Sequence, residues 1–156
     1  MIVGEQKPLD EIMDLLGEAR KVLVAGCGTC VTVCFAGGEK EVGILASELR
    51  MKSKLGGHPM EVDEVTVQRQ CEWEYIDPLA ERLDDYDVIL SLACGIGVQA
   101  MNEHFPDAIT MPGLNTTFLG LPEEQGVWRS GARRVGTAFS ASPAVSVPSP
   151  AAPSNC

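Results

Sequence analysis

Three cysteines lie close together near the start of the chain, in the stretch "VAGCGTCVTVC". Cys27, Cys30 and Cys34 have the spacing C-x2-C-x3-C and follow a short apolar run. If a helix starts there, Cys30 and Cys34 face the same way, because residues four apart are neighbours on a helix. A glycine-flanked loop that opens a helix also points backbone N–H groups at the site, and such groups stabilise thiolates. The spacing is therefore typical of a metal-binding loop.

Two further cysteines, Cys71 and Cys94, compete for the fourth ligand position of such a site. Three cysteines from one loop and one remote cysteine are the usual ligands of a [4Fe–4S] cluster, which is the interpretation that the spacing favours. Zinc held by four cysteines is the competing metal. The remaining alternatives are a redox pair made of Cys27 and Cys30, and cysteines that serve as small core residues.

Glycines accompany these cysteines in both halves of the chain. Gly26 and Gly28 flank Cys27, and Gly95 follows Cys94, so we expect all three to contact the cofactor through the backbone. Gly26 and Gly28 also form part of a dinucleotide-binding fingerprint. However, Val31 stands where the third glycine of that fingerprint belongs, so the signal for a dinucleotide is weak.

The elements between the cysteines predict a parallel sheet. Apolar runs at residues 21–25 and 87–92 indicate buried strands, and residues 61–68 and 108–111 indicate two more. Helical patterns separate them, at residues 9–16, 38–54, 78–83 and 98–104. This alternation predicts an α/β fold of Rossmann-like type, an open and mostly parallel sheet with helices on both faces.

The predicted strands bring the cysteines to one edge. Cys27 and Cys94 each come just after the carboxyl end of a strand, in two segments of similar pattern, and Cys71 lies three residues past another strand. In open α/β sheets the carboxyl edge is where ligands bind.

Composition limits the possible partners. The formal net charge of −10 argues against binding to nucleic acid, which needs a basic face. No apolar run approaches the length of a membrane span, and the first sixteen residues lack the basic and apolar regions of a signal peptide. We therefore expect a cytoplasmic protein, whose cysteines are ligands or catalysts more often than disulfides.

Two further stretches could cover a site or bind a partner. Trp73 and Tyr75 alternate with glutamates in "CEWEYIDP", as on an exposed edge, although ordinary packing also explains them. The stretch "MPGLNTTFLGLPEEQGVW" reads as extended and apolar, and it can wrap either a partner or its own domain.

Four segments together resemble the methylenetetrahydrofolate reductase C-terminal domain family, the small MetV-type proteins of anaerobic one-carbon metabolism. They are "VAGCGTCVTVCFAGGEKEVGILASELR", "RQCEWEY", "ILSLACGIGVQ" and "PGLNTTFLG", and the resemblance covers residues 8–129. It implies an iron–sulfur or zinc protein that partners a flavin-containing MetF-type large subunit and other redox proteins. It also implies a non-catalytic subunit, with a metal-ligand set of Cys27, Cys30, Cys34, Cys71 and Cys94.

The resemblance ends where the composition changes. Residues 1–129 form the predicted cysteine-cluster domain, and residues 130–156 are rich in alanine, serine and proline, which predicts a disordered tail. The family continues here with a second cysteine-rich segment, whereas residues 130–155 of this chain contain no cysteine. When the codons of the tail are read in a shifted frame, they can encode a cysteine-rich segment like that of the family. We therefore interpret the tail as the product of a frameshift. Resequencing that finds no insertion or deletion near the Arg129 codon would contradict this interpretation.

Overall fold

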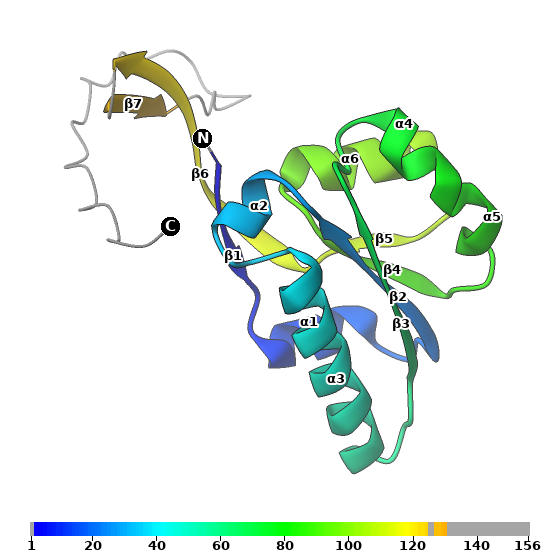
Figure 1. The fold of residues 1–156 in the computed structure, drawn as a ribbon. Helices are drawn as coiled ribbons and strands as arrows, with labels where there is room; N and C mark the ends of the chain where they lie inside the picture. The colour runs from blue at the N-terminus through cyan, green and yellow to red at the C-terminus, as the bar shows by residue number, and fades with distance from the viewer. Residues whose placement is uncertain (1, 125–126, 131–156) are drawn as a thin grey trace, which may run out of the picture.

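The computed structural model describes residues 2–124 and 127–130, and its centre is a four-stranded parallel sheet (Figure 1). The strands lie in the order β3-β2-β4-β5, and all three pairs are parallel. They span Lys21–Cys27 (β2), Glu61–Val67 (β3), Val88–Leu92 (β4) and Thr110–Pro112 (β5). The predicted α/β fold with a parallel sheet is confirmed.

Helices cover both faces of this sheet, as predicted. The strand β2 shows why: Val22 and Val24 belong to one buried cluster, and Leu23 and Ala25 belong to another. Successive side chains of a strand point to opposite faces, so these clusters are the two sides of the sheet. One side is covered by α1 (Leu9–Leu16) and α3 (Glu39–Leu55). The other is covered by α4 (Trp73–Ile76), η1 (Asp77–Leu79), α5 (Ala80–Leu83) and α6 (Gly95–His104).

Charges at the ends of the longest helix support its predicted position. The first turn of α3 carries Glu39 and Glu41, and its last turn carries Lys52 and Lys54. Acidic side chains at the start of a helix and basic ones at its end complement the helix dipole. The predicted helix and the observed one differ by one residue at each end.

A second, antiparallel sheet was not predicted. It has the order β1-β6-β7, with strands at Ile2–Gln6 (β1), Leu114–Glu124 (β6) and Val127–Ser130 (β7). Figure 1 shows β6 running away from the parallel sheet along the N-terminal strand β1 and on toward β7. The extended stretch therefore pairs with its own domain through β1. The predicted tail lies outside the described residues from position 131 onward.

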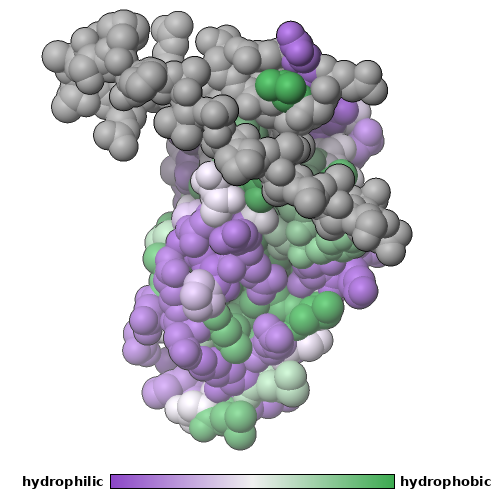
Figure 2. All heavy atoms as spheres, turned by 90° about the vertical axis from the view of Figure 1, so that its left-hand side faces the viewer, coloured by the Kyte–Doolittle hydropathy of each residue, from purple (hydrophilic) through white to green (hydrophobic). Residues whose placement is uncertain are grey.

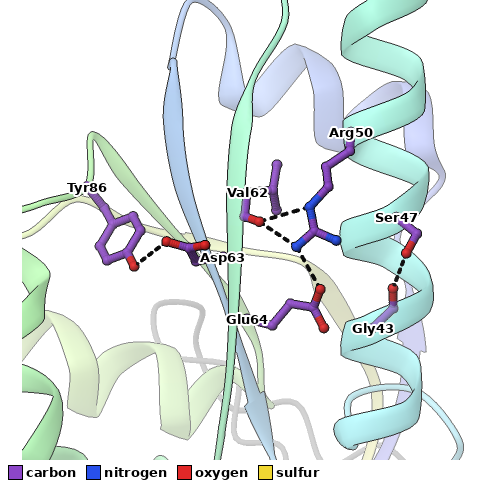
Figure 3. A network of polar contacts seen from close by, with 7 residues as sticks. All are labelled: Gly43, Ser47, Arg50, Val62, Asp63, Glu64 and Tyr86. Atoms are coloured by element: carbon purple, nitrogen blue, oxygen red, sulfur yellow. Dashed lines mark hydrogen bonds and ion pairs between the residues drawn. The ribbon is translucent and has the colours of Figure 1, made fainter.

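The edge strand β3 is protected by side chains (Figure 3). Arg50 of α3 donates from Nε and Nη2 to the Val62 carbonyl, at 3.0 and 2.5 Å, and from Nη2 to Glu64 at 2.7 Å. Tyr86 donates to Asp63 at 2.7 Å. Exposed edge strands invite pairing with other chains, and bound or charged groups along the edge prevent it.

The outer surface mixes polar and apolar groups. On the face in Figure 2, hydrophobic residues form separate spots among hydrophilic ones. Within the described part of the chain, every helix is too short or too polar to span a bilayer.

Asp87 ties the start of β2 to the loop before β4. Its carboxylate accepts hydrogen bonds from the backbone N–H of Lys21 at 2.9 Å and of Arg20 at 2.8 Å. These bonds hold the pKa of Asp87 below its usual value, and the bond from Lys21 has the larger effect. Such a group stabilises the fold above its unfolded-state pKa, and this contribution disappears as the pH falls through the lower folded-state value.

We therefore expect Asp87→Asn to lower the free energy of unfolding at neutral pH and to have less effect in acid. Urea unfolding of both proteins at pH 7 and at about pH 3 measures the difference. A difference that stays constant between the two pH values would contradict this role of the carboxylate.

Candidate functional site

The cysteine-bearing segments meet where the strand order reverses. From β2 the chain continues to β3 on one side, and it returns to β4 on the other side of β2. Ligands of open α/β sheets bind outside the carboxyl ends of the strands at such a switch point. Cys27 is the last residue of β2, and Cys94 follows β4 by two residues as the N-cap of α6. The predicted position of both cysteines at this edge is confirmed.

Cys27 is held firmly at the switch point. Its side chain is buried, its N–H donates to the Gly37 carbonyl at 2.9 Å, and its carbonyl accepts from Thr32 Oγ1 at 2.8 Å. The Thr29 hydroxyl lies 3.7 Å from the Cys27 sulfur and 4.0 Å from the Cys30 sulfur. One hydroxyl thus bridges the two thiols of the C-x2-C pair, a contact that the sequence pattern did not reveal.

Cys71 is the exposed member of the group. Partial burial raises the pKa of its thiol, and the negative charges of Cys27, Cys94 and Cys30 raise it further, whereas a backbone hydrogen bond lowers it. Charges affect a pKa in this way only at short range, so Cys71 lies within electrostatic range of the other three thiols.

Gln70 fixes the loop that carries Cys71. Its side chain is fully buried and donates from Nε2 to the Ala25 carbonyl of β2 at 2.8 Å. Its Oε1 accepts from the Ser91 hydroxyl of β4 at 2.6 Å. The amide therefore joins the two strands whose ends carry Cys27 and Cys94. A lone buried glutamine follows no sequence pattern, so this residue was missed.

Cys34 points elsewhere. It follows the four-residue helix α2 (Cys30–Val33), and its thiol lies 3.3 Å from the Ile2 carbonyl of β1 and 3.6 Å from the Cys30 carbonyl. Its hydrogen-bond partners are thus backbone groups of β1 and of its own helix. Among the five predicted ligands, Cys34 is the one whose thiol bonds to carbonyls away from the switch point.

The three predicted cofactor glycines have different positions. Gly26 is buried inside β2, where a Cβ atom would lie 2.5 Å from Val42 Cγ2, so close packing against α3 explains it. Gly28 and Gly95 are exposed at the sheet edge. The Gly28 N–H donates to the Val67 carbonyl at 2.9 Å, and the Gly95 N–H to Thr116 Oγ1 at 3.2 Å.

Gly37 is a second glycine required by packing. A Cβ atom there would lie 2.0 Å from the Leu92 carbonyl oxygen, so a larger residue would push the loop away from β4. This close approach lets the loop accept the hydrogen bond from Cys27.

The donor set suits a metal in the type of its ligands. Four cysteines from three loops, Cys27, Cys30, Cys71 and Cys94, are the ligands that iron–sulfur clusters and zinc share. As placed, no three His, Cys, Asp or Glu side chains of the described residues are arranged to hold a metal ion. A cysteine moves its sulfur by rotating one torsion, χ1, and Cys71 is exposed and able to do so.

Comparisons with known proteins give no relative: no family model, no curated protein and no solved structure matches the chain.

Proposed function

We propose that this chain is the cytoplasmic, non-catalytic small subunit of a flavin-dependent methylenetetrahydrofolate reductase. In this proposal it holds a [4Fe–4S] cluster and relays electrons to the flavin of a MetF-type large subunit. The observation that supports it best is the position of four cysteines beyond the carboxyl ends of the parallel strands: Cys27 and Cys30 at the end of β2, Cys71 after β3 and Cys94 after β4. The sequence resemblance supplies the identity of the partner.

The residues have distinct roles in this proposal. Cys27, Cys30, Cys71 and Cys94 hold the cluster, and Gln70 keeps the Cys71 loop between the two strand ends. Cys34 is left outside the ligand set, because its thiol faces the Ile2 carbonyl. A bound cluster would supply one-electron chemistry, and two electrons together with a proton reduce a flavin fully. Burial of Cys27 and Cys94 keeps water from that side of the site.

Anaerobic mixing of the reduced chain with an oxidised MetF-type flavoprotein tests this function. We expect the absorbance of the oxidised flavin to disappear at a rate that rises with the concentration of the chain. Cys94→Ser is expected to abolish the transfer, and Cys34→Ser to preserve it. A flavin that stays oxidised with the wild-type chain, yet is reduced by a viologen dye, would overturn the proposal.

A further inference from the structure

We propose that the carboxyl edge of the parallel sheet is a docking surface for a redox protein with a basic face, and that Phe35, Trp73 and Ile96 are its apolar contacts. This inference rests on the proposed function, because a partner that exchanges electrons must approach the cysteines.

Each cysteine-bearing segment places at least one large apolar side chain in solvent. Phe35 follows Cys34 and is 66% exposed, Trp73 follows Cys71 by two residues and is 56% exposed, and Ile96 follows Cys94 by two residues and is 51% exposed. Apolar side chains close to an edge site are typical of an interaction surface, and aromatic residues are enriched at interfaces. We name this set of three residues the edge patch.

The backbone at Phe35 adds a second observation. With a φ of 52°, Phe35 is the one residue other than glycine in the described part of the chain with a positive φ. This conformation is unfavourable for a bulky residue, and such strain gathers at functional positions. Here it accompanies an aromatic ring that is exposed to solvent.

Trp73 is exposed but held in place. Its ring stacks on His104 with centroids 4.9 Å apart and an interplanar angle of 27°. His104 in turn contacts the Asp77 carboxylate at 2.5 Å and the edge of the Phe105 ring, with centroids 4.6 Å apart. A side chain that is already ordered loses little entropy on binding, which favours its use as a contact.

The negative charge of the chain favours a partner with a basic surface. The formal net charge of the chain is −10, and Trp73 lies between Glu72 and Glu74. Arg69 pairs with Glu72, whereas no ion pair within the described ranges involves Glu74. A second copy of this acidic chain would be repelled, but a basic surface would be attracted and steered toward the edge. Redox complexes of this kind have small interfaces, so three apolar contacts are a suitable number.

A titration of the full, isotope-labelled chain with a basic c-type cytochrome tests the docking surface. We expect NMR shifts at the amides of the edge patch and at the Trp73 indole N–H, and few on α3. The affinity should fall at least tenfold between low salt and about 0.2 M salt, because screening weakens charge attraction. Acidic flavodoxin should bind at least tenfold more weakly than the cytochrome.

Two triple variants provide matched controls. Phe35→Ser, Trp73→Ser and Ile96→Ser together should weaken cytochrome binding at least tenfold. Ile44→Ser, Met51→Ser and Leu55→Ser remove three exposed apolar side chains from α3 and should leave it unchanged. Shifts centred on α3, equal affinity for flavodoxin, or an edge-patch variant that binds like the wild type would overturn the docking surface.

The same samples separate this inference from the proposed function. Binding is measured without electron transfer, so it does not depend on a cluster. Iron and sulfide analysis of the titrated protein addresses the proposed function on its own. A dimer that the edge-patch variant disrupts, seen by sedimentation, would replace the basic partner with a second copy and overturn the inference.

Discussion

Replacing Cys71 by serine is expected to remove most of the bound metal, whereas replacing Cys34 by serine leaves the metal content unchanged. Cys71 interacts electrostatically with the thiols of Cys27, Cys94 and Cys30, and the Cys34 thiol faces the carbonyls of Ile2 and Cys30. A serine hydroxyl is a poor ligand for iron or zinc, and the loss of one ligand in four removes much of the free energy of metal binding. We expect at least a tenfold lower metal occupancy after anaerobic gel filtration.

The two variants are a matched pair. Both replace one sulfur by one oxygen, and both residues lie in loops at the same edge of the sheet. Circular dichroism and urea unfolding show whether each variant folds. Equal loss of metal in both variants, or loss in Cys34→Ser alone, would return Cys34 to the ligand set and contradict the assignment made from its hydrogen bonds.

Replacing Gln70 by leucine is the second large effect that we expect. The change removes the hydrogen bonds to the Ala25 carbonyl and from the Ser91 hydroxyl, and it leaves that hydroxyl buried without its acceptor. Loss of a buried polar partner costs about 1–3 kcal/mol. Urea unfolding should therefore show a less stable protein, and metal affinity should fall as well because the Cys71 loop is no longer fixed.

A double variant separates the two consequences. In Gln70→Leu with Ser91→Ala the unpaired hydroxyl is gone, so much of the lost stability should return. The loop remains without its anchor, so the metal affinity should stay low. Recovery of both properties together would show that Gln70 acts on stability alone and does not position Cys71.

The elements with regular patterns were the predictable ones. The apolar runs of β2 and β4 and the helical spacing of α3 depend on local residues, and the structure places these elements within two residues of the predictions. These predicted elements in turn predicted the carboxyl edge of the sheet and the placement of Cys27 and Cys94 at that edge. Helix α6 begins at Gly95, three residues before the predicted start, because the glycines at its first turns obscure the pattern.

Features that depend on distant partners were not predictable. The five residues of β1 pair with β6, which lies more than a hundred positions away in the sequence. The local sequence of β1 does not predict that pairing. The bridge made by Gln70 likewise depends on Ala25 and Ser91, which come from two other strands. The outward direction of Cys34 follows from the same unpredicted strand, since its thiol meets the Ile2 carbonyl.

Metal and sulfide analysis of the full chain, purified without oxygen, tests directly whether this protein holds a [4Fe–4S] cluster. We expect about four iron and four sulfide per chain, with a broad visible absorption that bleaches on reduction. One zinc and no sulfide would contradict it, and the chain would then be a structural zinc subunit without a role in electron transfer.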